Sequence, residues 1–321
     1  MARLRLLADD LTGALDSAAR FVPLTGPVAI TWQDVGTEGS LAIDSGTRDL
    51  PAEAVGVRID RFAPSLGGGD PAFKKIDSLL RGHVALELAA CMHWFDHCVL
   101  APAFPFQGRI TRDSRQIARS GDGWRDTGVD LAAELHAHGI EAQIHDAETD
   151  ADLDAIVAEG RRLNGRVLWC GTGGLAGALA GPGLVPRPAL PTPRLALIGS
   201  DHAVSRAQVA AVPLDFQASV VMCDVPPGID RREARQRIGE RFSLLLRRIQ
   251  QPGTLFVTGG ETLRDICDAL GVTHLEVDGE LEPGVPTSLM HGGSWDGQRL
   301  VSKSGAFGDT GFIAELLGET R

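Results

Sequence analysis

The chain has 321 residues, 43% of them hydrophobic and 23% charged, a globular composition long enough for two domains with separate cores. Its formal net charge of −11 disfavours nucleic acid and anionic membranes as partners, and no stretch approaches the roughly 20 apolar residues of a membrane span. The five cysteines are scattered without metal-ligand spacing and no secretory leader precedes the first strand, so we expect a cytoplasmic protein with reduced thiols.

The basic residues are strongly biased toward arginine. Lysine and arginine total 31, yet the only lysines are Lys74, Lys75 and Lys303. A lysine retained in such a chain is typical of a phosphate or carboxylate site, where a compact ammonium fits and a planar guanidinium does not. We therefore expect a function for each lysine, with chance as the alternative.

Two adjacent carboxylates follow the first predicted strand. Residues 4–7 form a short apolar run, Asp9 and Asp10 come next, and residues 14–22 have helical spacing. Open α/β sheets bind ligands beyond the carboxyl ends of their strands, and two adjacent carboxylates there are costly unless they bind something. We predict a site at these residues, the alternative being that Asp10 or Thr12 only caps the helix.

Polar residues also follow the next strands, which we predict at residues 28–32, 41–44 and 73–76, before a helix at 84–94. An arginine here can bind a carboxylate bidentately, and the start of the helix would favour an anion. Such side chains recognise a small, anionic, hydroxylated molecule. They are Arg48, Lys75, Asp77, Ser78 and Arg81.

Strands and helices continue to alternate, which implies a mainly parallel sheet. The strand at residues 167–170 leads into GTGGLAGALAG, which resembles a dinucleotide turn but lacks the full G-x-G-x-x-G spacing, so we interpret it as a tight turn facing the ligand. The other elements expected here are strands at 98–101 and 142–145 and helices at 129–138 and 153–163.

A proline-rich stretch interrupts the pattern. Residues 186–193 contain four prolines and can form neither a helix nor a central strand. We predict a semi-rigid linker here between domains at 1–185 and 194–321.

The pattern then restarts with strands at 194–198, 219–223 and 254–257 and helices at 203–212, 231–249 and 263–270, the charges of 231–249 forming a solvated face. The strand at 254–257 leads into TGGET, where glycines let backbone N–H groups approach a phosphate. A rigid turn at 283–286 follows, and Lys303 then stands beside two glycines. No Walker A sequence occurs, so this is not a P-loop NTPase.

Seven motifs in order resemble the four-carbon acid sugar kinase family. They are LADDLTGALD (7–16), KIDSLLRG (75–82), APAFPFQGR (101–109), GS (199–200), TGGET (258–262), PGVP (283–286) and KSGAFG (303–308). The resemblance implies two α/β domains with mainly parallel sheets, the first binding an acid sugar and the second a nucleotide, joined by a proline-rich hinge with the active site in the cleft between them. It also implies ATP and Mg²⁺ as cofactors. After Arg109 the family has a glycine-containing turn and a hairpin, whereas this chain reads ITRDSRQIARSGDGW.

The resemblance and the residues together predict the roles in phosphoryl transfer. Asp9 or Asp10 would accept the hydroxyl proton and the other would position Mg²⁺, with Asp9 as the metal candidate. Because neighbouring residues at a strand end point apart, we expect only one to face the hydroxyl. The predicted substrate-binding residues are Thr12, Arg48, Lys75, Asp77, Ser78 and Arg81. The predicted ATP-binding residues are Ser200, Thr258, Gly259, Gly260, Glu261, Thr262, Gly284, Lys303, Gly305 and Gly308.

Two other functions stay open. A non-catalytic acid-sugar-binding protein would keep the fold and lose the transfer reaction, and the GTGGLAG turn admits a nicotinamide-dependent dehydrogenase. The sequence predicts a small-molecule substrate without identifying the sugar acid or the hydroxyl. It leaves the oligomeric state open, a homo-oligomer included.

Overall fold

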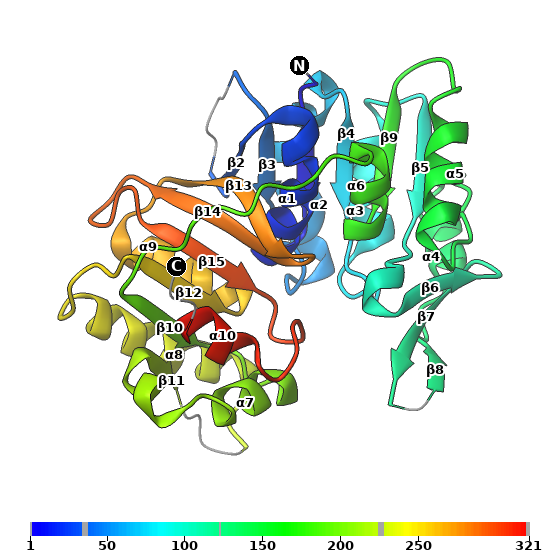
Figure 1. Ribbon diagram of the computed structural model, residues 1–321. Helices are drawn as coiled ribbons and strands as arrows, with labels where there is room; N and C mark the ends of the chain where they lie inside the picture. The colour runs from blue at the N-terminus through cyan, green and yellow to red at the C-terminus, as the bar shows by residue number, and fades with distance from the viewer. Residues whose placement is uncertain (1, 34–37, 122, 224–227, 319–321) are drawn as a thin grey trace. The chain divides into compact units, whose positions relative to one another are not determined.

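The computed structural model describes residues 2–33, 38–121, 123–223 and 228–318, and its ribbon is drawn in Figure 1. The chain divides into two compact units, Met1–Val185 and Pro186–Arg321, and the division falls at the start of the proline-rich stretch. Both units have the mixed α/β architecture, with a mostly parallel sheet, that the sequence predicts. No helix among the described residues is both long and apolar enough to cross a membrane.

The sheet of unit 1 is parallel throughout. Its strands lie in the order β2-β3-β1-β4-β9-β5. Their short, almost wholly buried apolar runs are typical of a sheet covered on both faces. The bounds are β1 Arg5–Ala8, β2 Val28–Thr31, β3 Leu41–Asp44, β4 Ala72–Lys75, β5 His97–Ala101 and β9 Val167–Gly171.

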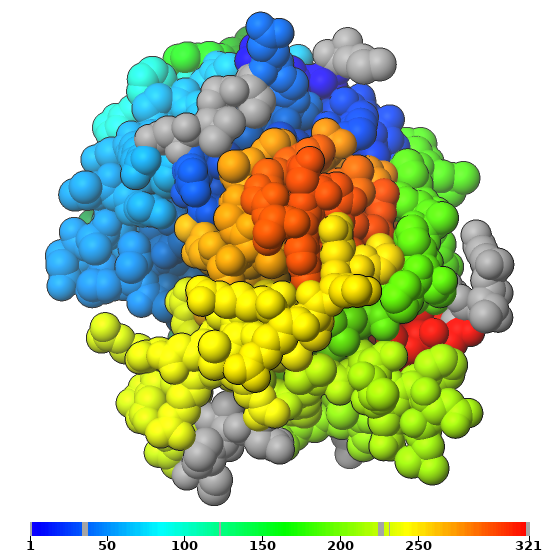
Figure 2. Space-filling view, turned by 90° about the vertical axis from the view of Figure 1, so that its left-hand side faces the viewer, coloured from blue at the N-terminus to red at the C-terminus, as the bar shows by residue number. Residues whose placement is uncertain are grey.

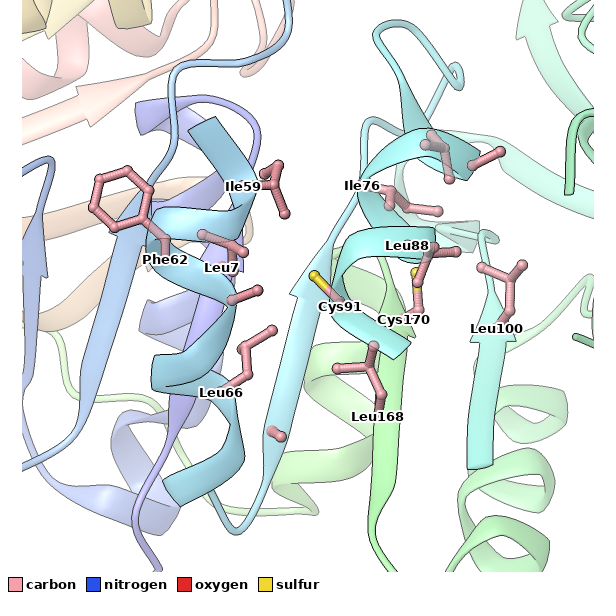
Figure 3. Close-up of a cluster of buried hydrophobic side chains, with 14 of the residues drawn as sticks. Leu7, Ile59, Phe62, Leu66, Ile76, Leu88, Cys91, Leu100, Leu168 and Cys170 are labelled. Carbon is pink, nitrogen blue, oxygen red and sulfur yellow. The ribbon is translucent and has the colours of Figure 1, made fainter. Parts of the chain in front are cut away.

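Helices cover both faces of this sheet. On one face the core gathers around Leu7, Ile59, Leu88 and Leu168 from β1, α2, α3 and β9 (Figure 3). Phe21 of α1 packs on Phe73 of β4, so α1 covers the opposite face. The helices are α1 Leu11–Thr25, α2 Ala52–Phe62, α3 Val84–Met92, α4 Leu131–Ala137, α5 Asp150–Gly160 and α6 Gly173–Ala180, with short 3₁₀ turns at Ala63–Gly68 and Pro105–Gln107.

A small antiparallel sheet replaces the parallel pattern after β5. It consists of β6 Arg109–Arg112, β7 Arg115–Ser120 and β8 Gly123–Asp126. A hairpin therefore forms in the segment that departs from the family sequence. Its turn residues Asp113 and Ser114 have φ of 51° and 59°, a left-handed conformation that such short polar side chains tolerate.

The prediction of a strand at residues 142–145 is wrong. Only Ile144 forms an isolated bridge, to Leu100. The His145 N–H donates to Leu100 of β5, but Ala147 then exchanges two hydrogen bonds with Thr111 of β6. Because the segment divides its backbone groups between two strands, it runs along neither.

The sheet of unit 2 is parallel on one side and antiparallel on the other. Its order is β11-β10-β12-β15-β14-β13, in which the pairs β15–β14 and β14–β13 are antiparallel and the other pairs are parallel. The sequence analysis missed the β13–β14 hairpin, whose turn is the predicted rigid turn at 283–286. The bounds are β10 Arg194–Ile198, β11 Val220–Met222, β12 Thr254–Thr258, β13 His274–Glu282, β14 Val285–His291 and β15 Arg299–Lys303.

The helices of unit 2 differ in burial. Phe312 and Ile313 of α10 pack on Ala196 and Phe256 of the sheet. The charged face of α8 is largely exposed, as predicted, and Figure 2 shows its outer surface in yellow-green to yellow. The helices are α7 Ala203–Ala210, α8 Arg231–Leu246, α9 Gly260–Leu270 and α10 Phe312–Gly318, with a 3₁₀ turn at Leu214–Ser219.

Candidate active site

In unit 1 the carboxyl ends of three strands meet at one edge of the sheet. Ala8, the last residue of β1, is in register with Asp44 of β3 and with Lys75 of β4. The predicted residues that follow these ends are thereby brought together: Asp9 and Asp10 after β1, Arg48 after β3, and Asp77, Ser78 and Arg81 after β4.

Arg48 is the centre of this cluster. Its Nε and Nη2 donate to the two oxygens of Asp9 at 2.7 and 2.8 Å, and its Nη1 donates to Asp10 Oδ2 at 2.6 Å. Burial would lower the pKa of Arg48, but the charges of Asp10 and Asp9 outweigh it and raise that pKa. Asp9 and Asp10 therefore bind different nitrogens of one guanidinium, and the expectation that only one of them faces the hydroxyl stays a prediction.

Asp10 also caps α1. Its Oδ1 accepts the Gly13 N–H at 2.8 Å, and its Oδ2 accepts the Thr12 hydroxyl at 2.6 Å. The capping alternative is thus realised alongside the ion pair. Burial acts to raise the pKa of Asp10, but Arg48 and Lys75 hold it below its usual value. For Asp9 burial prevails over Arg48 and raises the pKa.

Lys75 passes directly across Gly13. A Cβ on this glycine would lie 3.0 Å from Lys75 Nζ and 2.6 Å from Asp10 Oδ1, so only glycine leaves room for the lysine. The residue Lys75 is 5% exposed, and its ammonium donates a hydrogen bond to the Ile76 carbonyl at 2.9 Å. In the described part of the chain no carboxylate lies within ion-pair distance of it. Two of its three donors are therefore available to a ligand.

Asp77 and Arg81 form a bidentate pair at the outer end of the cluster. Arg81 Nε and Nη2 donate to Asp77 at 2.8 and 2.7 Å, and the Leu79 and Arg81 N–H groups donate to the same carboxylate. Although burial opposes it, this bonding with Arg81 and the charge of Arg48 hold the pKa of Asp77 well below its usual value. The Arg81 side chain is 62% exposed, and Ser78 is partly exposed beside it.

A buried network next to the Arg48 loop was not predicted from the sequence. Lys74 Nζ lies 2.6 Å from Glu87 Oε2, and the Thr47 hydroxyl donates to Glu87 Oε1 at 2.5 Å. Ser45 Oγ lies 2.7 Å from Thr47 Oγ1 and donates to the Ala8 carbonyl at 2.8 Å. The network joins α3 and β4 to the loop that carries Arg48. A glutamate inside the apolar run VALELAACM was the available signal.

In unit 2 the carboxyl ends of β10, β12 and β15 also meet. Ile198, Thr258 and Lys303 are in register across the three strands. The Gly199 N–H donates to the Thr258 carbonyl and the Gly259 N–H to the Lys303 carbonyl, which ties the three turns together. Ser200 and the glycines of TGGET therefore lie close to Lys303.

TGGET forms the turn from β12 into α9. Thr258 ends the strand, Gly259 is the N-cap, and Gly260 begins the helix. Glu261 lies in the first turn, where its carboxylate pairs with Arg235 at 3.3 Å. The buried Thr262 packs on Gly199 so closely that no side chain would fit there.

Lys303 is buried at this edge with few partners. It is 1% exposed, and its ammonium donates only to the Ser304 carbonyl, at 3.3 Å, among the residues that the structure describes. Burial lowers the pKa of Lys303 to about 8, against the opposing charge of Glu282. In the next strand the Thr258 hydroxyl is buried without a hydrogen-bond partner. Both polar groups are suited to an anion.

The KSGAFG loop is held from α7. Ser205 Oγ donates to the Gly305 carbonyl at 2.9 Å, and Gln208 Nε2 donates to Phe307 and Asp309 at 3.0 and 2.7 Å. A Cβ on Gly305 would overlap the Ser200 hydroxyl, so the loop requires glycine there.

Two further predicted glycines lie at the same edge. Gly284 forms the β13–β14 turn, next to Glu282 and Val285, which are in register. Gly308 lies beside the Glu282 carboxylate, and a Cβ built on this glycine would be 3.3 Å from Glu282 Oε1. Ser205, Gln208 and Glu282 were missed, because no single motif contains them.

The GTGGLAG turn packs against protein. The Thr172 hydroxyl donates to the Ala103 carbonyl at 2.7 Å, and Cβ atoms on Gly173 and Gly174 would meet Phe104 and Ala103 within 3 Å. The glycines thus serve close packing, and the expectation that this turn faces a ligand is wrong.

Known proteins match both units. The sugar-binding N-terminal domain family matches residues 4–130, and the nucleotide-binding C-terminal domain family matches residues 224–313. A D-threonate kinase of Cupriavidus necator is 30% identical, over 94% of this chain and 94% of its own length. A D-erythronate kinase of Heliobacterium modesticaldum is 23% identical, over 97% and 95%.

The fold has a solved counterpart in a Salmonella typhimurium LT2 protein. The two structures superpose with a TM-score of 0.72 over the whole of both chains, at 19% identity. With the full-length match to the Cupriavidus relative, the chain belongs to the four-carbon acid sugar kinase family.

Proposed function

We propose that the chain transfers the γ-phosphoryl group of ATP to a hydroxyl of a four-carbon sugar acid of the tetronate or 3-oxo-tetronate type. The observation that carries the proposal is that each unit has a buried lysine with spare donors at the carboxyl edge of its sheet. In unit 1 Lys75 lies among carboxylates, and in unit 2 Lys303 ends β15 next to the glycine turn that leads into α9. The relatives named as D-threonate and D-erythronate kinases match along nearly the whole chain, which supports the same conclusion.

The acid sugar would bind at the edge of unit 1. Lys75 has two free donors, and the exposed Arg81 keeps one guanidinium nitrogen outside its pairing with Asp77, so these two cations would hold the carboxylate. Ser78 and Thr12 would contact the hydroxyls. Arg48 is already bound by two aspartates, and its role would be to fix their positions.

ATP phosphates would bind at the edge of unit 2. The first N–H groups of α9, from Gly260 to Thr262, have no partner within the helix and attract anions. Lys303 and the Thr258 hydroxyl would neutralise and bind the phosphates, with Gly305 and Gly308 placing the following loop against them. Ser200, Gly259, Glu261 and Gly284 complete this predicted set.

Mg²⁺ is expected to enter with ATP, because it keeps most of its ligands as phosphates and waters. Among the described residues no group of three or more His, Cys, Asp or Glu side chains could hold a metal. Both oxygens of Asp9 accept hydrogen bonds from Arg48, and the positive charge of this guanidinium opposes the binding of Mg²⁺ to the same carboxylate in this arrangement. When bound, the metal would offset phosphate charge, and no step here depends on its position.

One carboxylate of the unit 1 cluster would accept the hydroxyl proton, a role worth roughly 10²–10⁴-fold in rate. The sequence predicts Asp9 or Asp10 for it. A site in the cleft between the domains, with the proline-rich segment as its hinge, stays a prediction. The five cysteines are all free thiols, which supports a cytoplasmic protein.

The proposal is tested by ADP release from Mg²⁺ and ATP in the presence of D-threonate, L-threonate, D-erythronate and their 3-oxo acids. We expect at least one acid to stimulate release well above the rate without acid. Calorimetry with ATP alone separates the alternative, because a protein that only binds acid sugars need not bind ATP. If no acid stimulates release and ATP does not bind, the protein is not a kinase. Binding of NAD would instead support the dehydrogenase.

A further inference from the structure

One carboxylate at the unit 1 edge has no part in the roles above. Asp16 lies on α1 one turn beyond Gly13, on the same face of the helix. Ser17 Oγ donates to its Oδ1 at 2.8 Å. Within the described ranges the carboxylate makes no other hydrogen bond and no ion pair, and it is partly exposed. An oxygen of Asp16 is therefore free to accept from a ligand.

Asp9 and Asp10 differ from Asp16 because each of their oxygens already accepts a hydrogen bond. Both oxygens of Asp9 are bound by the Arg48 guanidinium. Asp10 Oδ1 is bound by the Gly13 N–H, and its Oδ2 by Thr12 and Arg48. A general base must offer a lone pair to the hydroxyl that it deprotonates, within about 2.6–3.2 Å. Every oxygen of these two aspartates already accepts a hydrogen bond, and three of the four accept it from the Arg48 guanidinium, whereas Asp16 Oδ2 accepts none within the described ranges.

The charges around Asp16 also suit a base. The groups that act on it are Lys75 from β4, Asp10 at the start of α1 and Arg20 one turn further along the helix. Burial raises the pKa of Asp16 to about 6, against the opposing charge of Lys75. The pKa of Asp10 is shifted the other way, below its usual value. A base whose pKa lies near the working pH is the most effective in proton transfer.

Lys75 lies near Asp16 on the same face of α1. Its side chain crosses α1 at Gly13, one turn from Asp16, and its charge acts on the Asp16 carboxylate, so an acid held by the spare donors of Lys75 would lie near Asp16. The LADDLTGALD motif thus supplies a cap at Asp10, a gap at Gly13 and a free carboxylate at Asp16.

We propose, on the basis of the function proposed above, that Asp16 is the residue that accepts the proton of the acid-sugar hydroxyl while Lys75 holds the acid. The O–H bond breaks and its proton passes to an Asp16 oxygen. The hydroxyl oxygen forms the new bond to the γ-phosphorus, and the bond from that phosphorus to the β–γ bridging oxygen breaks. The products are the phosphorylated acid and ADP, with Asp16 neutral until it releases the proton to water.

The test compares Asp16→Asn with Asp9→Asn and Asp10→Asn in the wild-type background, using whichever acid gives the fastest ADP release. We expect Asp16→Asn to lower kcat by about 10²–10⁴-fold, with the KM for acid and ATP changed only a few-fold. The fall in wild-type kcat below about pH 6 should disappear in its residual activity. Asp16→Glu should recover part of the rate together with the pH dependence.

Asp154→Asn is the matched control, since this exposed aspartate on α5 lies outside the site and should leave kcat unchanged. Near-ultraviolet circular dichroism establishes that each variant is folded. The assignment of Asp16 is overturned if a folded Asp16→Asn keeps kcat within threefold and retains the wild-type pH dependence, or if Asp10→Asn alone removes that dependence. An inactive wild-type protein that binds no ATP would instead refute the kinase function itself, and the base assignment with it.

Discussion

The buried Lys74–Glu87 pair gives the sharpest prediction about stability. Lys74 Nζ lies 2.6 Å from the carboxylate, and the two side chains are 0% and 2% exposed. The Lys74→Met variant leaves Glu87 buried without its cation, and the Thr47 hydroxyl is then its only hydrogen-bond donor among the described residues. Breaking one partner of a buried pair costs about 3–5 kcal/mol. We expect a loss of that size in the free energy of unfolding of unit 1.

Urea unfolding followed by tryptophan fluorescence measures this loss, because four of the five tryptophans lie in unit 1. Arg112→Met is the control. It breaks a pair with Glu148 whose side chains are 54% and 46% exposed, and such exposed pairs contribute little to stability because water screens them.

The double variant Lys74→Met, Glu87→Leu separates charge from packing. Two apolar side chains of similar size replace the pair, so we expect most of the loss to be recovered. The reasoning is refuted if Lys74→Met costs less than about 1 kcal/mol, or if the double variant is no more stable than the single one.

Three further predictions concern activity. Gly13→Ala places a Cβ against the Lys75 ammonium and the Asp10 carboxylate, and should lower turnover at least tenfold without unfolding the protein. Gly56→Ala is the control, because its Cβ meets nothing within 4 Å, and it should leave turnover unchanged. Equal turnover in the two variants would contradict the close approach of Lys75 to Gly13. ATP affinity should fall as the pH rises through about 8, because Lys303 loses its proton there, and calorimetry on Lys303→Met should show no such fall. Gln208→Ala removes the hydrogen bonds to two carbonyls at the KSGAFG loop, and should raise the KM for ATP several-fold without raising the KM for the acid. Gln236→Ala, on the exposed helix α8, is the control and should change neither KM. A rise in the KM for the acid alone would count against a nucleotide site at this loop.

The strand ends of unit 1 were predictable from local sequence. Short apolar runs followed at once by polar residues locate β1, β3 and β4, and the ligand-binding edge of a parallel sheet follows from that order. The three lysines were singled out by composition alone, and all three are buried at strand ends, between 0% and 5% exposed.

Sequence reasoning was weaker where strands change direction. The segment predicted as a strand at 142–145 does not form one, because the backbone of this region hydrogen-bonds first to β5 and then to β6. The β13–β14 hairpin was missed because its PGVP turn was interpreted without the strands that it joins. Antiparallel pairing depends on register across the chain, which no short window contains.

The sequence by itself determined the family, the α/β alternation and the identity of most polar residues at the two edges. Only the tertiary structure decided which of these polar groups are already hydrogen-bonded within the protein. Arg48 binds both oxygens of Asp9 and one oxygen of Asp10, because these side chains converge on one guanidinium, and the Gly13 N–H binds the other oxygen of Asp10. Asp16 keeps an oxygen without a hydrogen bond among the described residues, because the cations that act on it, Lys75 and Arg20, form no ion pair with it. Hydrogen-bond occupancy depends on distances between elements, and those distances exist only after the chain has folded.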